Sequence, residues 1–437
     1  MKAPLLPTLV VLLFTAGTCT EKPELPWREG MTSPRLEQLK QQVKTGESGA
    51  VAHFWEEMKA RHTPLVETIP GDQGHALVTF LYQAQQPTKN VVLISQLTTS
   101  RDPADIVLTR LLSTDVWYKT YLLRNDMRLS YSLVPNPTPE SLAYNSELQL
   151  RDPLNPVYLP GTANVGHSAL QLPAATPQPW IASMPDVPTG KIEEIQVESK
   201  ILNSQRKAWV YIPAGYEANR RAPYSLLVCF DGFVYSAPEW VPTPTILDNL
   251  IKAGKIPPTL AVFIDQSAKR NLELSNNPQF ADFVATELLP QVRKQWRATS
   301  DPAHTIVCGS SAGGLAGAFI AFRHSDVFGN VLSQSGAFWP GKTRDNPEHE
   351  WLTRQFESSP KLPVRFVLQA GILEIGPTPL NGPSILATNR HLKDVLKAKG
   401  YDVNYSEVAG GHEPLTWRGG LAEGLIQLQE NEDKPEK

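Results

Sequence analysis

Residues 305–317 constrain the fold of this chain more than any other segment. A β-branched run leads into Gly309-Ser310-Ser311-Ala312-Gly313, and small residues then open a helical pattern. The G-x-S-x-G spacing is typical of a serine on a sharp strand-to-helix turn, because glycines two residues before and after it remove side chains that would collide. The Ser311 hydroxyl would then stand at the amino end of a helix, where developing negative charge is favoured. The segment predicts a nucleophile elbow.

Length and charge narrow the class of protein. The chain has 437 residues, which is more than one average domain and suggests two. Its 41 lysine and arginine residues nearly balance 44 aspartate and glutamate residues, for a net charge of -3. A chain with this balance has no overall basic field of the kind that nucleic acid or anionic lipid selects. We therefore expect no nucleic-acid partner.

The first 20 residues have the pattern of a secretory signal peptide. One early lysine precedes an apolar run at 9–14 and small residues at 15–18. The run is too short to span a bilayer, and no later segment is long and apolar enough, so we expect no integral membrane span. A buried N-terminal helix is the alternative. Lipidation at Cys19 is less favoured, because Thr18 is a poor match before a lipoprotein cysteine. We expect a periplasmic protein.

The cysteines do not indicate a disulfide framework. There are three in the whole chain, too few for a stapled fold. Cys229 and Cys308 each lie in a β-branched or aromatic run, which favours small buried hydrophobic side chains. A single bridge between these two residues is the alternative that the sequence leaves open.

The first half of the chain divides into three segments that differ in composition and in hydrophobic pattern. Residues 21–63 are polar and look helical, notably at 35–43 and 50–59. Residues 64–150 carry short apolar runs separated by turn residues, which predicts an immunoglobulin-like β-sandwich. The runs lie at 76–82, 90–94, 116–121 and 128–133. Residues 151–190 are rich in proline and are interpreted as a linker.

Strands and helices alternate from residue 191 to about 430, before a charged tail at 431–437. Strands are predicted near 192–198, 207–212, 224–230, 259–264, 304–308, 329–333, 364–370 and 403–408. Helices are predicted near 241–253, 279–296, 313–323, 385–399 and 415–428. A strand pair followed by strand-helix repeats indicates a mostly parallel sheet with helices on both faces. With the serine elbow after the fifth strand, the predicted fold is an α/β-hydrolase.

A serine nucleophile needs a base, and in this fold the base follows the nucleophile and the acid in the chain. His412 is the histidine after the last predicted strand, on a glycine-bearing loop where catalytic groups collect in open α/β sheets. A solvated loop histidine is the alternative. Four other histidines do not fit the chain order of nucleophile, acid and base, or do not follow a suitable strand end: His304, His324, His349 and His391.

Glu374 is the predicted acid. It is the first carboxylate after the strand at 364–370, where the acid of this fold is expected. Asp394 falls within a predicted helix, and Asp402 opens the last strand from the opposite edge, so both are placed less well. A Ser311–His412 dyad, with Glu374 a surface residue, is the alternative.

The oxyanion hole requires two backbone N–H groups. One belongs to the residue after the nucleophile, Ala312, and the other to the loop after an early central strand. That loop is Asp231-Gly232-Phe233, in which Gly232 allows close backbone approach and either Gly232 or Phe233 could donate. An ordinary tight turn would contain the same glycine.

Several motifs together are more specific than the elbow. They are Gly410-Gly-His-Glu-Pro-Leu-Thr-Trp-Arg-Gly-Gly-Leu-Ala-Glu-Gly-Leu-Ile426, Leu332-Ser-Gln-Ser-Gly-Ala-Phe-Trp339, Phe230-Asp-Gly232, Arg270-Asn-Leu-Glu-Leu274 and Asp152-Pro-Leu-Asn155. With them, residues 65–430 closely resemble the bacterial ferric enterobactin (enterochelin) esterases. The resemblance implies hydrolysis of the serine trilactone backbone of a catecholate siderophore, with iron entering only as part of the substrate. It implies no cofactor and no metal site of the protein's own.

The same resemblance assigns roles by matching position. Ser311 is then the nucleophile, His412 the base and Glu374 the acid of an acyl-enzyme mechanism. Candidates for the substrate cleft are Arg270, Trp339, Trp417 and Arg418. Guanidinium groups and indoles suit a flat, anionic tris-catecholate. The alternatives are that both tryptophans pack the core and that Arg418 pairs with a helix carboxylate.

Two other functions are consistent with the sequence. One is a feruloyl or acetyl esterase acting on plant polysaccharide, with the sandwich as a sugar-binding module. The other is a periplasmic siderophore-binding protein without catalysis, against which the intact order Ser311, Glu374, His412 speaks. The best-known members of the family act in the cytoplasm, whereas this chain begins with an export pattern.

Overall fold

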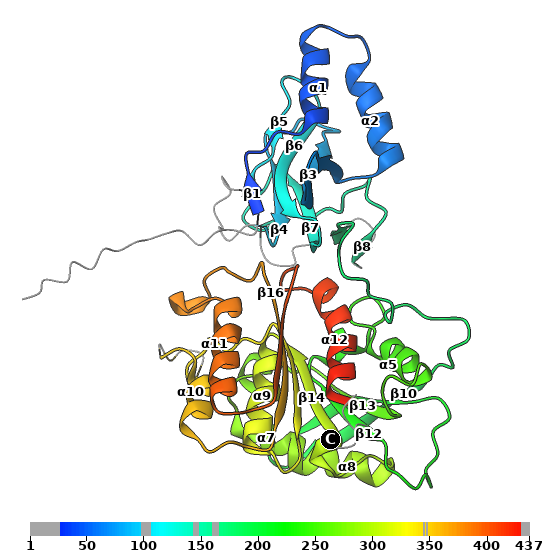
Figure 1. Cartoon of the computed structure of the whole chain (residues 1–437), viewed down its shortest axis with the longest axis vertical. Helices are drawn as coiled ribbons and strands as arrows, with labels where there is room; N and C mark the ends of the chain where they lie inside the picture. Colours follow the sequence, from blue (N-terminus) through cyan, green and yellow to red (C-terminus); the bar gives the residue numbers. More distant parts are fainter. Residues whose placement is uncertain are drawn as a thin grey trace, which may run out of the picture.

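The computed structural model of the chain describes residues 27–97, 106–142, 148–159, 166–343, 346 and 348–429. The expected signal peptide at 1–20 and the charged tail at 431–437 lie outside these residues. Figure 1 shows a smaller N-terminal domain above a larger α/β domain, and the larger domain contains the elbow.

An eight-stranded sheet forms the centre of the larger domain, in the order β10-β11-β13-β12-β14-β15-β16-β17. The first two strands, β10 (Lys191–Ser199) and β11 (Ser204–Ile212), form an antiparallel hairpin, and β11 is also antiparallel to β13. The other neighbours are parallel: β13 (Thr259–Ile264), β12 (Ser225–Cys229), β14 (Thr305–Ser310), β15 (Asn330–Gln334), β16 (Arg365–Gly371) and β17 (Val403–Val408). This arrangement confirms the predicted α/β-hydrolase fold.

Helices cover both faces of this sheet (Figure 1). One face packs against α7 (Pro278–Phe283), α8 (Leu289–Gln295), α9 (Ala312–Arg323), α10 (Trp351–Ser358) and α11 (Ile385–Ala398). The other packs against α4 (Gly232–Ser236), α5 (Thr243–Lys252) and α12 (Pro414–Gln429). A short helix, α6 (Arg270–Glu273), follows β13.

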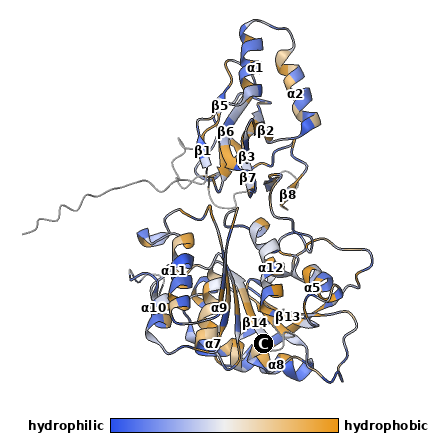
Figure 2. Ribbon diagram, in the orientation of Figure 1, coloured by the Kyte–Doolittle hydropathy of each residue, from blue (hydrophilic) through white to orange (hydrophobic). Residues whose placement is uncertain are grey.

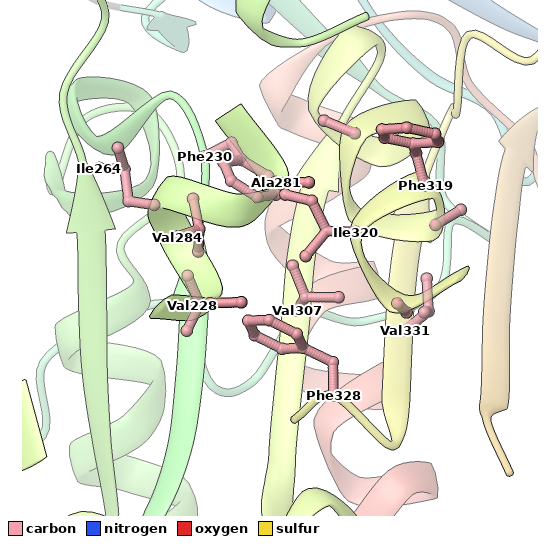
Figure 3. Close-up of a cluster of buried hydrophobic side chains, with 14 of the residues drawn as sticks. Val228, Phe230, Ile264, Ala281, Val284, Val307, Phe319, Ile320, Phe328 and Val331 are labelled. Atoms are coloured by element: carbon pink, nitrogen blue, oxygen red, sulfur yellow. The ribbon is translucent and has the colours of Figure 1, made fainter. Parts of the chain in front are cut away.

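The core on the α9 face is apolar throughout. Figure 3 shows Val228, Val307 and Val331 from neighbouring strands packed beside helix residues such as Val284 and Ile320, and all five are buried. Figure 2 shows the apolar character of this helix: α9 is coloured largely hydrophobic, whereas α1 (Pro34–Lys44) in the N-terminal domain is largely hydrophilic. Helix α9 is therefore held by burial on nearly every side, which fixes the residue that precedes it, Ser311.

The helix predicted at 279–296 is not one regular α-helix. A π-helical turn, Val284–Leu288, separates α7 from α8. Pro290 stands in the first turn of α8 and has no N–H to give to the carbonyl four residues earlier, so the preceding turn widens.

The N-terminal domain is built from two antiparallel sheets. One sheet has the order β1-β6-β3-β2, with β5 paired to β6, and the other has the order β4-β7-β9-β8. The strands are β1 (Trp27–Glu29), β2 (Leu65–Ile69), β3 (Asp72–Gln83), β4 (Val91–Ser95), β5 (Thr109–Arg110), β6 (Val116–Arg124), β7 (Arg128–Pro135), β8 (Tyr158–Leu159) and β9 (His167–Gln171). Buried side chains from both sheets, including Phe80 and Tyr131, meet between them, which gives the predicted sandwich its core.

The sequence boundaries of this domain differ from the structural ones at both ends. Residues 21–63, predicted as a separate polar segment, contribute β1 and two helices, α1 and α2 (Ala50–Arg61), whose apolar sides pack on the outer face of the first sheet. Residues 151–190, predicted as a linker, contain β8 and β9, and β9 pairs with β7. These pairings join segments distant in sequence, so a local pattern of prolines did not reveal them.

The structure also bears on a possible disulfide, on membrane-spanning helices and on metal sites. Cys229 and Cys308 are register partners on β12 and β14, and both are buried and free, so the bridge between them is not formed. In the described part of the chain, no helix is both long enough and apolar enough to cross a membrane. Within those same residues, no three His, Cys, Asp or Glu side chains gather to hold a metal ion.

Candidate active site

The predicted elbow is present, and its backbone is strained as that motif requires. Ser311 has φ 55° and ψ -121°, between the end of β14 and the first residue of α9. Its N–H donates to the carbonyl oxygen of Gln334 on β15, at 2.9 Å. A Cβ atom at Gly309 would lie 2.6 Å from the carbonyl carbon of Gly313, so the turn excludes any side chain there. The surrounding sheet and helix thus hold the strained Ser311 in place.

His412 and Glu374 form a short hydrogen bond. His412 lies on the loop between β17 and α12, and Glu374 lies just after β16. The ring Nδ1 is 2.5 Å from Oε1 of Glu374, and the other carboxylate oxygen accepts the N–H of Gly371 at 2.7 Å. The Glu374 side chain is only 1% exposed, whereas that of His412 is 26% exposed. Because an ionised carboxylate can only accept, Nδ1 carries the proton and Nε2 is left as the basic atom.

One cavity of about 900 Å³ brings these groups together. Its wall includes Ser311, Ala312, Glu374 and His412, so these residues border a common space. The rest of the wall comes mainly from α6, the segment after β15 and residues 376–381. Gln96, from the N-terminal domain, also lines it. A cavity of this size at the carboxyl ends of parallel strands is where α/β enzymes bind their substrates.

Ala312 lines the cavity at the start of α9, as an oxyanion donor would. Gly232 and Phe233 open α4 on the neighbouring strand end, but neither is part of the cavity wall, and Phe233 is 61% exposed. Gly232 is required for another reason: a Cβ there would lie 2.9 Å from the carbonyl oxygen of Ile264 on β13. Gly232 therefore allows its backbone to lie close to β13, and the predicted close approach to the substrate is not what requires a glycine here.

Of the four predicted cleft residues, Arg270 and Trp339 line the cavity. Arg270 donates from Nε and Nη2 to the two carboxylate oxygens of Asp231, each at 2.5 Å, and Asp231 is buried. This two-point pair fixes the guanidinium at the cavity wall and offsets much of its charge. Arg270 is therefore a directional donor at this wall more than a source of net positive charge.

Trp417 and Arg418 do not line the cavity. Trp417 is buried, donates from Nε1 to Ser335 Oγ at 3.0 Å, and meets the His412 ring edge to face at 5.2 Å between centroids. It thus packs behind the histidine, as the core-packing alternative describes. Arg418 donates to Gln178 at 2.9 Å, and burial together with the charge of Arg128 lowers the pKa of its guanidinium.

Sequence reasoning missed Gln334 as a support of the site. Besides accepting the Ser311 N–H, Gln334 accepts the hydroxyl of Tyr235 from α4 at 2.9 Å. Its amide nitrogen donates to Gln369 at 2.9 Å and to the Trp417 carbonyl at 2.8 Å. One buried residue therefore joins the elbow, the turn after β12 and the start of α12. Gln334 lies within the Leu332-Ser-Gln-Ser-Gly motif, and this motif was the one sequence feature that could have pointed to it.

Glu413, next to His412, is buried, so its ionisation is coupled to folding. Burial raises the pKa of its carboxyl from the ordinary 4.5 to about 7, against the opposing effects of the Ser130 N–H, His412 and Arg418. The folded state therefore binds more protons than the unfolded state between these values. Stability contributed by the protonated carboxyl is present at low pH and is lost as the pH rises to about 7.

We expect Glu413→Gln to be more stable than the native protein at about pH 8, by roughly 2 to 3 kcal/mol, since the amide needs no deprotonation. Its carbonyl oxygen can still accept the Ser130 N–H, which Glu413 accepts at 2.9 Å. Chemical denaturation at about pH 5 and about pH 8 measures this, and the two proteins should converge at the lower pH. An equal difference at both values would show that the carboxyl does not titrate in this range.

Comparison with known families gives two matches that together span most of the chain. Residues 199–428 match the family described as putative esterase, and residues 77–181 match the family described as enterochelin esterase, N-terminal. The second match ends beyond β9, in agreement with the structural extent of the N-terminal domain.

Named relatives agree with these matches. The chain is 31% identical over 340 residues to an iron(III) enterobactin esterase of Escherichia coli, covering 74% of this chain and 81% of that relative. It is 29% identical to the iron(III) enterobactin esterase of Dickeya dadantii, covering 87% and 93%. The crystal structure of the enterobactin esterase of Shigella flexneri in the presence of enterobactin superposes with a TM-score of 0.68 at 28% identity, covering 85% and 96%.

Proposed function

The chain belongs to the enterobactin esterase family, and on this premise we propose that it hydrolyses the trilactone ester bonds of a catecholate siderophore of the enterobactin type, releasing its iron. It is a carboxylic ester hydrolase. One observation supports this function from the chain's own residues. Buried Glu374 is hydrogen-bonded to His412, and Ser311 lies on the wall of the same cavity.

In the proposed reaction, Ser311 Oγ attacks the ester carbonyl carbon while Nε2 of His412 takes its proton. Glu374 holds the ring by Nδ1 and stabilises the imidazolium that forms. The N–H of Ala312, at the start of α9, stabilises the oxyanion. For the second donor we keep Gly232 or Phe233, which open α4 after the neighbouring strand β12, although neither lines the cavity in this structure. The proton then passes to the departing seryl hydroxyl.

The acyl-enzyme is resolved by the same groups in reverse order. His412 takes a proton from water, the hydroxide attacks the Ser311 ester, and the freed oxygen of Ser311 recovers the proton. Because the first ester is part of a ring, its alcohol and its acyl group belong to one molecule, and hydrolysis of the acyl-enzyme releases the opened, linear siderophore as the product. To Arg270 and Trp339, which line the cavity, we assign contacts with the rest of the substrate, as a hydrogen-bond donor and as a stacking surface.

Product analysis tests this function. Purified protein is mixed separately with ferric enterobactin and with iron-free enterobactin, and linear trimer, dimer and monomer are separated and weighed by mass spectrometry. We expect ring opening in at least one of the two forms. Absence of any cleavage in both, with turnover of ferulate esters by the same preparation, would favour the polysaccharide esterase instead.

We also propose that the protein is exported to the periplasm, on the pattern of residues 1–20. The expected mature protein begins between Thr18 and Lys22, because small residues precede that stretch. Mass spectrometry of the native protein from the periplasmic fraction measures the new terminus. An intact Met1 on cytosolic protein would refute export, and a diacylglycerol mass on Cys19 would show a lipoprotein.

A further inference from the structure

The loop that carries His412 is bonded to the N-terminal domain at three successive points. The N–H of Arg128 on β7 donates to the Ala409 carbonyl at 2.8 Å, and the N–H of Ser130 donates to the Glu413 carboxylate. Between them, the His412 N–H donates to Oε1 of Gln96 at 3.4 Å. The catalytic histidine therefore stands on a segment supported from the other domain.

Gln96 itself is fixed in place by its neighbours. It follows β4, and the next residue, Leu97, is buried in the sandwich core together with Ile372 and Leu373 of the α/β domain. A Cβ on Gly411 would lie 2.5 Å from Cγ of Gln96, so the glutamine stem rests directly on the backbone beside His412. This contact explains a glycine at the position before the histidine.

The oxygen and the nitrogen of the Gln96 carboxamide have different hydrogen-bonding roles. A backbone N–H can only donate, so the oxygen of the side chain is turned to His412 and the amide nitrogen is turned away from it. Gln96 also lines the catalytic cavity. No acceptor for Nε2 lies within hydrogen-bond distance among the residues that the structure describes. Two N–H donors therefore remain for a molecule in the cavity.

We propose that Gln96 is a substrate-specificity residue that the N-terminal domain supplies to the active site, an inference that rests on the proposed function. Its amide nitrogen donates to the carbonyl oxygen of the N-acyl amide that each acylated serine unit carries beside its ester. Gln96 contacts the backbone of the general base, so its donor lies close to the ester under attack, and that amide carbonyl is only a few bonds away from the ester. The N-terminal domain thereby selects esters of N-acylserine.

Two esters of different chemistry test this role. Dihydroxybenzoylserine methyl ester carries the amide carbonyl, and para-nitrophenyl acetate does not. For Gln96→Met, which keeps the length of the side chain but has no N–H, we expect kcat/KM to fall about tenfold more for the first ester than for the second, mainly through KM. Gln96→Glu keeps an oxygen for the His412 N–H and loses the donor, so it should show the same selective loss.

The control is Gln86→Met, an exposed glutamine in the same domain that does not line the catalytic cavity. It should leave both activities unchanged. Equal losses on the two esters in Gln96→Met and Gln96→Glu would show that Gln96 only supports the His412 loop, and no loss on either would show no role, so each result overturns the proposal. Failure of the wild-type protein to open enterobactin refutes the proposed function separately, because the two small esters still report on Gln96.

Discussion

Ser311→Ala abolishes ester cleavage, with an expected loss in kcat on the order of 10³-fold or more, by analogy with serine triads. The hydroxyl acts only in the chemical step, and the N–H of Ser311, which anchors the elbow to Gln334, is kept. Alanine at this position retains the strained φ of 55° with one fewer polar atom, so folding and siderophore binding should change little. Turnover is measured by product analysis, and binding by quenching of intrinsic fluorescence.

The control for this variant is Ser310→Ala. Ser310 ends β14 and is buried beside the nucleophile, so it tests whether loss of a neighbouring hydroxyl has the same effect. We expect it to keep most of the activity. Substantial turnover by a well-folded Ser311→Ala protein would remove Ser311 as the nucleophile.

Glu374→Gln is expected to slow the reaction by about a hundredfold or more, because the amide keeps the shape but loses the charge that stabilises the His412 imidazolium. The amide can also turn its N–H toward Nδ1, which favours the wrong tautomer of the ring. The Glu374 side chain is only 1% exposed, so bulk solvent screens the lost charge weakly. The pH profile of kcat/KM measured with the same substrate reports the change in the base.

Asp402→Asn is the matched control, since it makes the same chemical change at the other candidate acid. Asp402 directly precedes β17, is 57% exposed and pairs with Arg365 at 3.1 Å, away from the cavity. We expect nearly native turnover from this variant. Equal, native turnover in both variants would indicate a Ser311–His412 dyad, and inactivity of Asp402→Asn alone would overturn the assignment of Glu374 as the acid.

The elements that sequence predicted best are those with local signals. The strand before Ser311 and the helix after it are encoded within 13 residues, and the sheet followed from a repeated alternation of strand and helix. Glu374 and His412 were placed by chain order, and the structure finds them 2.5 Å apart. Their position after the strand ends required no knowledge of side-chain packing.

The features that sequence did not predict depend on contacts between distant segments. The pairing of β9 with β7 crosses a proline-rich stretch, so a linker was the natural interpretation of residues 151–190. Trp417 was a candidate for the cleft from the family resemblance, with core packing as the alternative, and in the structure it packs against the His412 ring from α12. Gln96 could not be singled out from the sequence, because its contact is with a loop 316 positions away.

The support of the His412 loop by β7 also determines how this enzyme loses activity on heating. The hydrogen bonds from Arg128 and Ser130 exist only while the sandwich is folded. If the sandwich melts first, the His412 loop loses its anchor although the Ser311 elbow and its sheet remain intact. Thermal inactivation should therefore follow the less stable of the two domains, even where that domain is the sandwich, which contains neither Ser311 nor His412.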